Sequence, residues 1–399
     1  HGVPRVSLPN LANLQGVDGA RILARLDLNV PIKDGRVADD TRITAALPTL
    51  QWLLERGSIV AACSHLGKAK GSPDPAYSLQ PVAPVLAEAL GREVTFVPDC
   101  LDPSIQDAEP GSFLLLENHR FYAGEKANDP NFAAHLAAGF THYVNDAFGT
   151  AHRAHASVVG VPALIPPGRR VAGMLIEREV AALGRHVDRP QQPYVAVVGG
   201  AKVSTKTAPL RALLERVQTL HIGGGMANTF FKAKGLEVGR SLVENEMIET
   251  AREVLAAAGE RSVVLELPTD VVVTDSIDSP HTIDVVPADA IPSGRMVVDI
   301  GPETQQRYAA ALDHARTVFW NGPMGIFEVD DFSAGTLGVA RALAASSAYS
   351  VVGGGESVMA IRRAGVADEI DHVSTGGGAA LQFLTGEELP ALTALENGG

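Results

Sequence analysis

Short apolar runs alternate with segments of helical spacing along nearly the whole chain, and this alternation limits the possible folds more than any other feature. Strands separated by helices form βαβ units, in which the strands run parallel and the helices cover the sheet. After Pro193 the alternation resumes and continues to about Leu384. We therefore predict an α/β fold with parallel sheets flanked by helices. In the first half, strands are predicted at 21–28, 58–64, 94–97 and 113–116, and helices at 41–56, 79–90 and 132–138.

Glycine clusters are concentrated in the second half of the chain, and each follows a short apolar run. Most of them precede a segment with helical spacing, which gives the pattern strand, tight turn, helix. Glycine allows backbone N–H groups to approach an anion closely, and the amino terminus of a helix adds favourable dipole charge. The repeated pattern predicts a sheet edge that holds phosphate groups, although glycine also simply closes tight turns. The clusters lie at 199–202, 223–225, 321–325, 353–355 and 376–378.

Composition excludes several classes of protein. With 399 residues, of which 46% are hydrophobic, the chain is long enough for two domains and can bury a substantial core. Its two cysteines, Cys63 and Cys100, exclude a disulfide framework and favour a reducing compartment. No uninterrupted apolar run is long enough to span a bilayer. We expect no secretory leader and no membrane partner, and hence a cytoplasmic protein.

The charge balance is acidic, because 33 lysines and arginines against 46 aspartates and glutamates give a formal net charge of −13. A negative surface repels the backbone of DNA and RNA, so nucleic acid is not an expected partner. An anionic ligand must instead be attracted by local basic groups, and the positions of those groups become informative.

A domain boundary is predicted near the middle of the chain. A proline-rich stretch at 161–168 precedes an amphipathic segment at 174–187, and Pro190 and Pro193 then stop the helix. We predict that 174–187 forms a helix that connects two domains. The alternative is a peripheral helix in one large domain, which the chain length also permits.

Several basic residues of the first half follow predicted strands. In parallel α/β folds, ligands gather at the carboxyl ends of the strands, so convergent arginines there favour a site for phosphate and carboxylate groups. Taken singly, each arginine has a more ordinary role on the solvated surface. It is the set as a whole that favours a binding site. The residues are Arg25, Arg42, Lys68, Arg120 and Arg153, accompanied by His65, His152 and His155.

A series of short motifs runs through the chain in a characteristic order. In the first half they read RLDLNVP at 25–31, SHLG at 64–67, ENHR at 117–120 and NDAFGTAHRAH at 145–155. In the second half they read GGAKVSTK at 199–206, GGGMA at 223–227, WNGPMGIFE at 320–328, GGGES at 353–357 and HVSTGGGA at 372–379. With these motifs the chain resembles the phosphoglycerate kinase family, from about Arg21 to Leu389.

The resemblance implies two Rossmann-like domains joined by a hinge helix. It implies reversible transfer of a phosphoryl group from 1,3-bisphosphoglycerate to MgADP, giving 3-phosphoglycerate and MgATP, in glycolysis and gluconeogenesis. The implied partners are these small molecules, the implied cofactor is Mg²⁺, and the protein is expected to be a monomer. The implied divisions are a 3-phosphoglycerate domain at 1–173, the hinge helix at 174–188, a nucleotide domain at 189–383, and a tail at 384–399 that packs back on the first domain.

The resemblance also implies which residues contact the glycerate. Asp27 and Asn29 hold its hydroxyl group, although short polar side chains at strand ends also act as backbone caps. Arg42 lies beside the carboxyl group and stabilises charge on the migrating phosphoryl group. The residues implied to bind the nontransferring phosphate are His65, Arg120 and Arg153, with Lys68 as a further substrate contact.

The nucleotide side is implied in the same way. Lys202 steers the transferring phosphoryl group, and Lys206 binds the nucleotide phosphates. GGAKVSTK is not a P-loop, because no glycine directly precedes Lys206. Gly376 to Gly378 open a helix whose N–H groups face the phosphoryl group in flight. The implied catalytic residues are Arg42, Lys202, Gly376 and Gly377. The implied nucleotide-binding residues are Gly200, Ala201, Lys202, Lys206, Gly224, Gly225, Asn321, Pro323, Glu328, Gly353, Gly354, Gly355, Glu356 and Ser357, and Glu356 is also the implied Mg²⁺ ligand.

The chain departs from the family's pattern at these sites. After Gly67 the family usually continues with Arg-Pro, whereas this chain has Lys68 and Ala69. Lysine keeps the charge and loses the planar fork of arginine. The magnesium position is usually aspartate and is Glu356 here, while Ser357 replaces the more familiar threonine. None of these changes removes a charge or an oxygen ligand, so we expect activity.

No general base is predicted. The acceptor in the reverse direction is a carboxylate with a pKa near ~4, which is already ionised at neutral pH. His65 and His152 are therefore interpreted as binding or supporting groups, not as proton-transfer groups.

Two other functions stay open on the sequence alone. A kinase for a simple carboxylic acid would have no second phosphate for the basic residues to bind. A noncatalytic nucleotide-binding protein would have no use for Arg42 or Lys202 at a reacting phosphoryl group. A panel of carboxylate substrates separates the first alternative, and binding of MgADP without turnover would favour the second.

Overall fold

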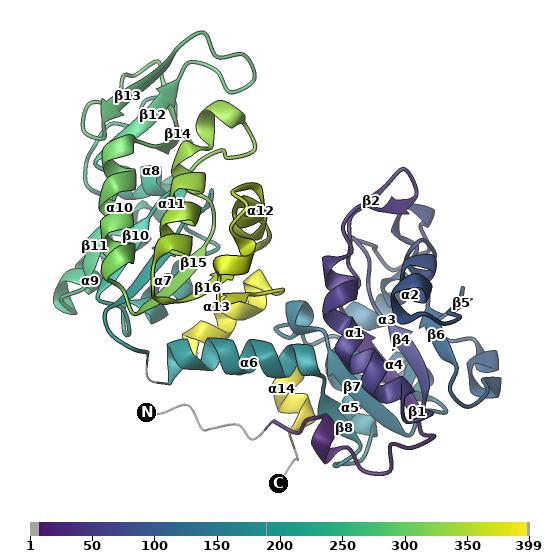
Figure 1. The fold of residues 1–399 in the computed structure, drawn as a ribbon. Helices are drawn as coiled ribbons and strands as arrows, with labels where there is room; N and C mark the ends of the chain where they lie inside the picture. Colours follow the sequence, from purple (N-terminus) through teal and green to yellow (C-terminus); the bar gives the residue numbers. More distant parts are fainter. Residues whose placement is uncertain (1–7, 189, 397–399) are drawn as a thin grey trace. The chain divides into compact units, whose positions relative to one another are not determined.

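The computed structural model describes residues 8–188 and 190–396 and divides into two compact units. The N-terminal unit lies within Pro4–Ala181 and takes in the chain from Glu388 onward, and the C-terminal unit lies within Ala182–Glu387. Predictions that concern His1 and Arg189 fall outside the described residues. Each unit is built around its own parallel sheet (Figure 1). In the described part of the chain, no helix has the length and apolar character needed to cross a membrane.

The N-terminal unit contains a six-stranded sheet with the order β5-β6-β4-β1-β7-β8. Every neighbouring pair is parallel, which confirms the prediction of βαβ units. The predicted strand at 21–28 ends early, because the Leu28 N–H donates to Ser64 Oγ at 2.8 Å and not to a neighbouring strand. The strands are β1 (Arg21–Leu26), β4 (Ile59–Cys63), β5 (Thr95–Val97), β6 (Phe113–Leu116), β7 (His142–Asp146) and β8 (Arg170–Ala172), and a separate hairpin pairs β2 (Ile32–Lys33) with β3 (Arg36–Val37).

Alternate residues of β1 face opposite sides of this sheet. Ile22, Ala24 and Leu26 pack in a core cluster with Leu50 and Leu53 of helix α1, and all five side chains are fully buried. Burial of one such leucine contributes about 1.5–3 kcal/mol, so this layer holds α1 firmly on the sheet. The helices of the unit are α1 (Thr41–Leu54), α2 (Val82–Leu90), α3 (Ala123–Ala127), α4 (Pro130–Ala137), α5 (Val161–Leu164) and α14 (Pro390–Leu395).

Local capping explains where the helices begin. The helix predicted from 132 starts two residues earlier as α4, because Asp129 Oδ1 accepts a hydrogen bond from the Phe132 N–H at 2.8 Å. Pro130 occupies the first helical position, where no N–H is needed. The predicted helix at 79–90 begins later, at Val82.

The segment predicted as a connecting helix is helical over the predicted range, as α6 (Met174–Val187). Its first turn is capped by Asp146 at the end of β7, whose Oδ1 accepts hydrogen bonds from the N–H groups of Leu175 and Ile176 at 2.8 and 3.2 Å. The Met174 N–H donates to Thr49 Oγ1 of α1 at 2.9 Å. The start of α6 is therefore tied to the sheet and to α1.

Helix α14 lies in the N-terminal unit, although it comes from the end of the chain. The Ala391 N–H donates to the Ala151 carbonyl at 3.0 Å, and Arg170 Nη2 donates to the Glu396 carbonyl at 3.1 Å. These contacts attach the end of the described chain to β8 and to the segment after β7.

The C-terminal unit contains a second six-stranded parallel sheet, with the order β11-β10-β9-β15-β16-β17. The chain moves outward from β9 in one direction, through β10 and β11, and then returns to add β15 on the other side of β9. Such a reversal leaves a crevice outside the carboxyl ends of the two central strands. The strands are β9 (Tyr194–Val198), β10 (Thr219–Ile222), β11 (Val264–Glu266), β15 (Thr317–Asn321), β16 (Tyr349–Gly353) and β17 (His372–Val373).

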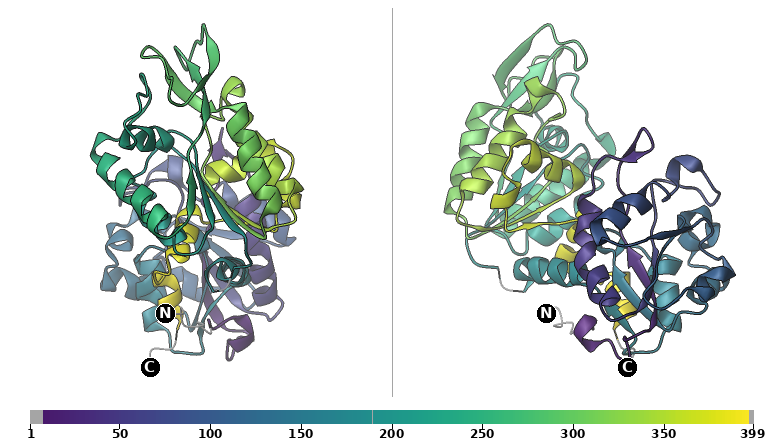
Figure 2. Two further views of the ribbon diagram at one scale, coloured as in Figure 1. Left: turned by 90° about the vertical axis from the view of Figure 1, so that its left-hand side faces the viewer. Right: turned by 45° about the vertical axis from the view of Figure 1, so that its right-hand side comes forward.

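Helices cover both faces of this sheet. Tyr308 and Leu312 of α10 and Val339 of α11 join Val195 and Val197 of β9 in one core cluster, and Figures 1 and 2 show α10 beside α11. Helices α7 and α13 pack together, as do α8 and α9. The helices are α7 (Thr207–Leu213), α8 (Met226–Ala233), α9 (Ile248–Glu260), α10 (Pro302–His314), α11 (Ala334–Ala345), α12 (Gly355–Arg363) and α13 (Gly377–Thr385).

One part of the C-terminal unit departs from the predicted parallel pattern. An antiparallel sheet has the order β13-β12-β14, with strands β12 (Asp270–Thr274), β13 (Ile283–Pro287) and β14 (Met296–Ile300). No helix separates these strands, so they are joined by short connections that only antiparallel strands allow.

Candidate active site

The predicted substrate residues of the N-terminal unit follow the carboxyl ends of its strands. Asp27 and Asn29 come after β1, His65 after β4, Arg120 after β6 and Arg153 after β7. Because parallel strands of one sheet end at the same edge, these residues are brought to one side of the unit. The sequence pattern of basic residues after strands therefore corresponds to one edge in space.

Asp27 and Arg42 form an ion pair, with 2.6 Å between Asp27 Oδ2 and Arg42 Nη1. The Asp27 side chain is buried and the Arg42 side chain is one-third exposed, at 34%. Arg42 is the second residue of α1, where the helix dipole disfavours a cation, so the carboxylate offsets an unfavourable position. Asp27 Oδ1 also accepts from the Asn29 N–H at 3.3 Å, so the strand-end capping role and the ion pair coexist.

The turn after His65 is held by two of the predicted residues. Asn29 Oδ1 accepts a hydrogen bond from the Gly67 N–H at 2.8 Å, and Arg120 Nη1 donates to the Gly67 carbonyl at 3.1 Å. Burial lowers the pKa of Arg120 to about 10, with help from the charges of Arg25 and Arg153, and at neutral pH the guanidinium stays charged. Burial and Arg25 hold the pKa of His65 well below its ordinary value, so its imidazole is neutral.

The remaining predicted substrate residues are exposed. Lys68 and Arg153 both lie on the surface. The residue after Lys68 is anchored, because Lys126 Nζ donates to the Ala69 carbonyl at 2.6 Å. The charges of Arg120 and Arg153 lower the pKa of Lys126, although burial contributes most. Several cations therefore share this edge, as a site for an anion with more than one negative group requires.

The C-terminal unit contains a cavity of about 340 Å³ at the carboxyl ends of β9, β15 and β16. Its position matches the crevice expected where the strand order reverses. The walls come from the turn after β9, the turn after β15 and the start of α12. The lining residues are Gly199, Gly200, Ala201, Lys202, Thr205, Lys206, Asn321, Gly322, Gly354, Glu356 and Ser357.

The two central turns pack backbone against backbone. The Gly200 N–H donates to the Pro323 carbonyl at 2.9 Å, and the Gly199 N–H donates to the Asn321 carbonyl at 3.0 Å. Gly322 has a φ of +97°, and a Cβ at this position would overlap the carbonyl oxygen of Gly199. No other residue fits here, which gives a physical reason for glycine in this pair of turns.

Lys206 provides the charge inside the cavity. Its Nζ donates to Asn321 Oδ1, and Asn321 Nδ2 donates to the Gly353 carbonyl at 2.8 Å. Burial lowers the pKa of Lys206 to about 8, against the opposing charge of Glu356. A partly desolvated ammonium group gains from an incoming anion, so this lysine is suited to phosphate oxygens. Lys202, in contrast, is exposed.

The amino terminus of α12 forms another wall. Glu356 and Ser357 lie in its first turn, with Glu356 exposed and Ser357 buried. Ser357 Oγ accepts a hydrogen bond from the Gly322 N–H at 2.6 Å. The described residues include no cluster of three or more histidine, cysteine or acidic side chains that could hold a metal ion.

Not every predicted nucleotide residue lines this cavity. Gly224 packs against the backbone of Gly200, and Gly377 at the start of α13 packs against Gly354, so both support the walls. Glu328 is exposed. The predicted residues that do not line the cavity are Gly224, Gly225, Pro323, Glu328, Gly353, Gly355, Gly376 and Gly377.

Three lining residues were not predicted individually, namely Gly199, Thr205 and Gly322. All three lie inside the motifs GGAKVSTK and WNGPMGIFE. The motifs therefore contained the signal, but which of their residues face the cavity depends on the path of each turn.

Comparisons with known proteins agree with this arrangement over nearly the whole chain. The model of the family described as Phosphoglycerate kinase matches residues 11–387. The phosphoglycerate kinase of Moorella thermoacetica is 50% identical over 385 residues, which cover 95% of this chain and 97% of that protein. The chloroplastic phosphoglycerate kinase of Volvox carteri is 48% identical over 389 residues, which cover 95% of this chain and 84% of that protein. The solved structure of phosphoglycerate kinase from Coxiella burnetii is similar with a TM-score of 0.86 and 43% identity, covering 97% of this chain and 98% of that chain.

Proposed function

The chain belongs to the phosphoglycerate kinase family, and we propose how its residues share that family's reaction. The protein is a phosphotransferase of glycolysis with a nucleotide as co-substrate. It transfers a phosphoryl group reversibly from 1,3-bisphosphoglycerate to ADP, giving 3-phosphoglycerate and ATP. The observation that best supports the assignment of roles is the cavity that contains Lys202, Lys206 and the start of α12.

The nucleotide phosphates bind in this cavity. The half-buried ammonium group of Lys206 and the helix terminus beside Ser357 both favour negative charge. Lys202 is exposed at the rim, which suits a group that follows the transferring phosphoryl. Gly376 and Gly377 open α13 and offer backbone N–H groups to the same phosphoryl. The other nucleotide contacts are Gly200, Ala201, Gly224, Gly225, Asn321, Pro323, Glu328, Gly353, Gly354 and Gly355.

Glu356 is the Mg²⁺ ligand in this proposal. Magnesium prefers oxygen ligands, keeps several waters, and is commonly held by one or two carboxylates together with substrate phosphates. An exposed carboxylate on the cavity wall, without a three-residue protein cluster among the described residues, fits that mode of binding. When bound, Mg²⁺ neutralises charge on the phosphate oxygens.

The glycerate binds at the strand edge of the N-terminal unit. Its hydroxyl group is held by Asp27 and Asn29. Its nontransferring phosphate is bound by His65, Arg120 and Arg153, with Lys68 nearby. Arg42 contacts the carboxyl group, and its ion pair with Asp27 at the start of α1 supports this role by orienting the guanidinium group. Bidentate N–H donors of arginine match phosphate and carboxylate oxygens well.

The chemistry requires positioning and charge stabilisation, not a base. The carboxylate that attacks or leaves is ionised at neutral pH. Arg42 and Lys202 stabilise charge on the phosphoryl group as it moves between donor and acceptor. The neutral imidazole of His65 donates a hydrogen bond and transfers no proton.

We further propose the division of the chain into a glycerate domain at 1–173, a hinge helix at 174–188, a nucleotide domain at 189–383 and a tail at 384–399. The working form is a cytoplasmic monomer whose partners are its small-molecule substrates. Sedimentation of the purified protein with and without ligands tests the oligomeric state.

A coupled assay tests the function as a whole. MgATP is supplied with 3-phosphoglycerate, or with acetate, glycerate or 2-phosphoglycerate, and ADP formation is followed. We expect turnover with 3-phosphoglycerate and little with the others, because only this compound offers both a carboxylate and a phosphate at the required separation. Folded protein that forms ADP equally well with a simple carboxylate would instead be a kinase of another class.

A further inference from the structure

Arg25 is a fully buried cation at the end of β1. It points to the face of the sheet opposite the core cluster that contains Ala24 and Leu26. A buried charge is costly unless it is paired and hydrogen-bonded. Asp27, the nearest carboxylate in sequence, is engaged with Arg42. The charge of Arg25 is therefore balanced by other groups.

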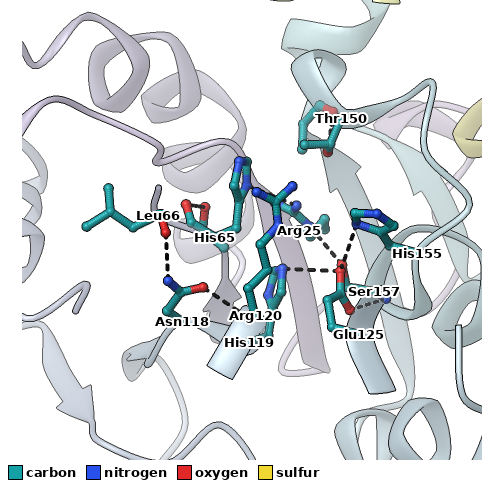
Figure 3. Close-up of polar contacts among 12 residues, drawn as sticks. Arg25, His65, Leu66, Asn118, His119, Arg120, Glu125, Thr150, His155 and Ser157 are labelled. Atoms are coloured by element: carbon teal, nitrogen blue, oxygen red, sulfur yellow. Dashed lines mark hydrogen bonds and ion pairs between the residues drawn. The ribbon is translucent and has the colours of Figure 1, made fainter. Parts of the chain in front are cut away.

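Those groups are Ser157 and Glu125. Arg25 Nε donates to Ser157 Oγ at 2.9 Å, and Ser157 Oγ in turn donates to Glu125 Oε1 at 2.7 Å. The Ser157 N–H donates to the second carboxylate oxygen, Glu125 Oε2, at 2.9 Å. Ser157 Oγ thus donates its single proton to Glu125 and accepts a hydrogen bond from Arg25. Ser157 therefore bridges the two opposite charges. Figure 3 shows Arg25 between His65 on one side and Ser157 on the other.

Two histidines complete the surroundings of Glu125. Its Oε1 lies 3.3 Å from His119 Nε2 and 3.7 Å from His155 Nδ1. Burial holds the pKa of His119 well below its ordinary value and lowers the pKa of His155 to about 4, so both are neutral at pH 7. Neither competes with Arg25 as a counter-charge for the carboxylate. Burial raises the pKa of Glu125, whereas the charge of Arg25 and the two hydrogen bonds from Ser157 favour the carboxylate form. The carboxylate is therefore stabilised by Arg25 and Ser157.

The other end of the Arg25 guanidinium determines the state of His65. Arg25 Nη1 donates to the Leu26 carbonyl, and Arg25 Nη2 lies 3.4 Å from His65 Nδ1. A guanidinium group only donates hydrogen bonds, so His65 Nδ1 must accept, and it cannot carry a proton. The neutral imidazole therefore carries its proton on Nε2.

We propose that Ser157 and Glu125 are positioning residues that hold Arg25 against His65 and thereby keep His65 in the Nε2–H tautomer. In this tautomer His65 has one ring donor, which it offers to the phosphate of the glycerate. The inference rests on the proposed role of His65 in substrate binding. It adds residues that touch no substrate and that none of the sequence motifs assigned to the site.

Such an arrangement is useful because neutral imidazole can carry its proton on either ring nitrogen. Its two tautomers are close in energy in water, and only one places a donor on the nitrogen facing an anion. The wrong tautomer would present a lone pair to the phosphate. A fixed cation at Nδ1 removes the ambiguity without making His65 charged, and a buried carboxylate behind a hydroxyl bridge keeps that cation in place.

The variant that tests the proposal is Ser157→Ala. It removes the bridge, leaves both charges, and deletes one oxygen atom. Ser157→Thr keeps the hydroxyl group and serves as the rescue variant. Ser58→Ala is the matched control, since Ser58 is equally buried in the same unit and its Oγ donates to the Val17 carbonyl at 2.8 Å. The measurements on the full chain are the ¹⁵N shifts of the His65 ring and steady-state kinetics with both substrates.

We expect wild type and Ser58→Ala to show His65 as the Nε2–H tautomer. Ser157→Ala should show a mixture of tautomers and a KM for 3-phosphoglycerate raised by about tenfold, the effect of one charge-assisted hydrogen bond. Its KM for MgATP should be unchanged, because the nucleotide binds in the other unit. Ser157→Thr should restore both readouts. Glu125→Gln, which removes the charge and keeps a group of the same shape, should resemble Ser157→Ala.

Two results would overturn the proposal. One is an unchanged His65 tautomer with an unchanged KM for 3-phosphoglycerate in Ser157→Ala. The other is an equal rise in the KM of both substrates, matched by Ser58→Ala, which would mean general damage. Failure of the proposed function is distinguishable, because wild type would then not bind 3-phosphoglycerate at all, while the tautomer of His65 would still be measurable.

Discussion

At the scale of the residue, the two units offer different kinds of groups for binding an anionic ligand. The proposed anion site of the N-terminal unit contains arginines whose positions are set by ion pairs and by backbone carbonyls, as for Arg42 on Asp27 and Arg120 on Gly67. In the C-terminal unit, the cavity is lined by glycine turns and the half-buried Lys206.

Arg42 is the first residue to test. Arg42→Ala should lower kcat by about 10³- to 10⁵-fold, the range observed when a cation that stabilises a moving phosphoryl group is removed. The affinity for MgADP should stay the same, because the nucleotide site is formed by the other unit. Rapid-quench or steady-state kinetics and calorimetry give the two values. Arg92→Ala, an exposed arginine of the same unit, is the control, and near-normal turnover of Arg42→Ala would remove Arg42 from catalysis.

Lys206 predicts a pH dependence of nucleotide binding. Burial lowers its pKa to about 8 in the free protein, and bound phosphates raise that pKa because they favour the charged form. Nucleotide binding should therefore take up protons above pH 8, and the affinity should fall as the pH rises through about 8. Calorimetry at pH 8.5 in two buffers of different ionisation enthalpy measures the uptake. Lys206→Met should abolish it, and absence of uptake in wild type would contradict the prediction.

At the scale of the element, strand-to-helix turns form the walls of the cavity that we propose as the nucleotide site. Each turn of this kind leaves the last strand carbonyls and the first helical N–H groups at the sheet edge. Asn321 and Ser357 then tie the turns after β15 and β16 to each other. The cavity walls are thus braced by hydrogen bonds between elements, and no single turn is sufficient.

Alanine substitutions at three glycines should rank by their local geometry. Gly294→Ala meets open space and should be neutral, Gly200→Ala carries strain from a φ of +109°, and Gly322→Ala adds an overlap with backbone to a φ of +97°. Left-handed geometry alone costs an alanine about 1–2 kcal/mol. The loss of MgADP affinity and of stability should follow the order 322, 200, 294. Equal effects of Gly322→Ala and Gly294→Ala would show that the turn relaxes freely.

The cap of α6 predicts a pH dependence of stability. Burial raises the pKa of Asp146 to about 6, so the folded form holds a proton that the unfolded form, in which the pKa is 3.8, releases. Stability from this group is complete below pH 3.8 and is lost as the pH rises through about 6. Asp146→Asn does not titrate and can keep the Oδ1 acceptor for Leu175 and Ile176.

The wild type should therefore lose stability relative to Asp146→Asn between pH 4 and pH 7, by on the order of 2–3 kcal/mol. Denaturant unfolding of both proteins at the two pH values measures the difference. A difference that does not change with pH would mean that Asp146 is ionised in the folded protein throughout this range.

At the scale of the whole molecule, the proposed reaction joins ligands that bind to different units. Phosphoryl transfer needs the reacting atoms about 3 to 3.5 Å apart and shielded from water. In the proposed arrangement each ligand by itself contacts mainly one unit, so we expect only the pair to gain from closure and to shift the equilibrium toward the closed form.

We accordingly predict that the radius of gyration falls clearly only when 3-phosphoglycerate and a nonreactive MgATP analogue are both present. Small-angle scattering of the free protein, of each binary complex and of the ternary complex gives the comparison. The expected pivots are α6 and the chain near Leu384. An unchanged radius under saturating ligands, in protein that turns over normally, would show that closure is not driven by the ligands.

The sequence by itself determined the fold class and most of the elements. The alternation of apolar runs and helical segments is a local property, and it predicted β6 and α6 with their observed bounds. It could not predict the antiparallel strands β12 to β14, because apolar runs such as that of Asp270–Thr274 look the same in either kind of sheet. The sequence pattern also could not predict the order of the strands within each sheet, because strand pairing joins residues that lie far apart in the chain.

Only the tertiary structure decided which residues of a motif face the site. Gly199 and Gly322 line the cavity while Gly224 supports it from behind, although all three stand in glycine clusters. Arg25 stands in the motif RLDLNVP, but nothing in the sequence indicated that Ser157 and Glu125 would hold it. The three residues come from three separate segments of the chain, and only the folded structure brings these segments together.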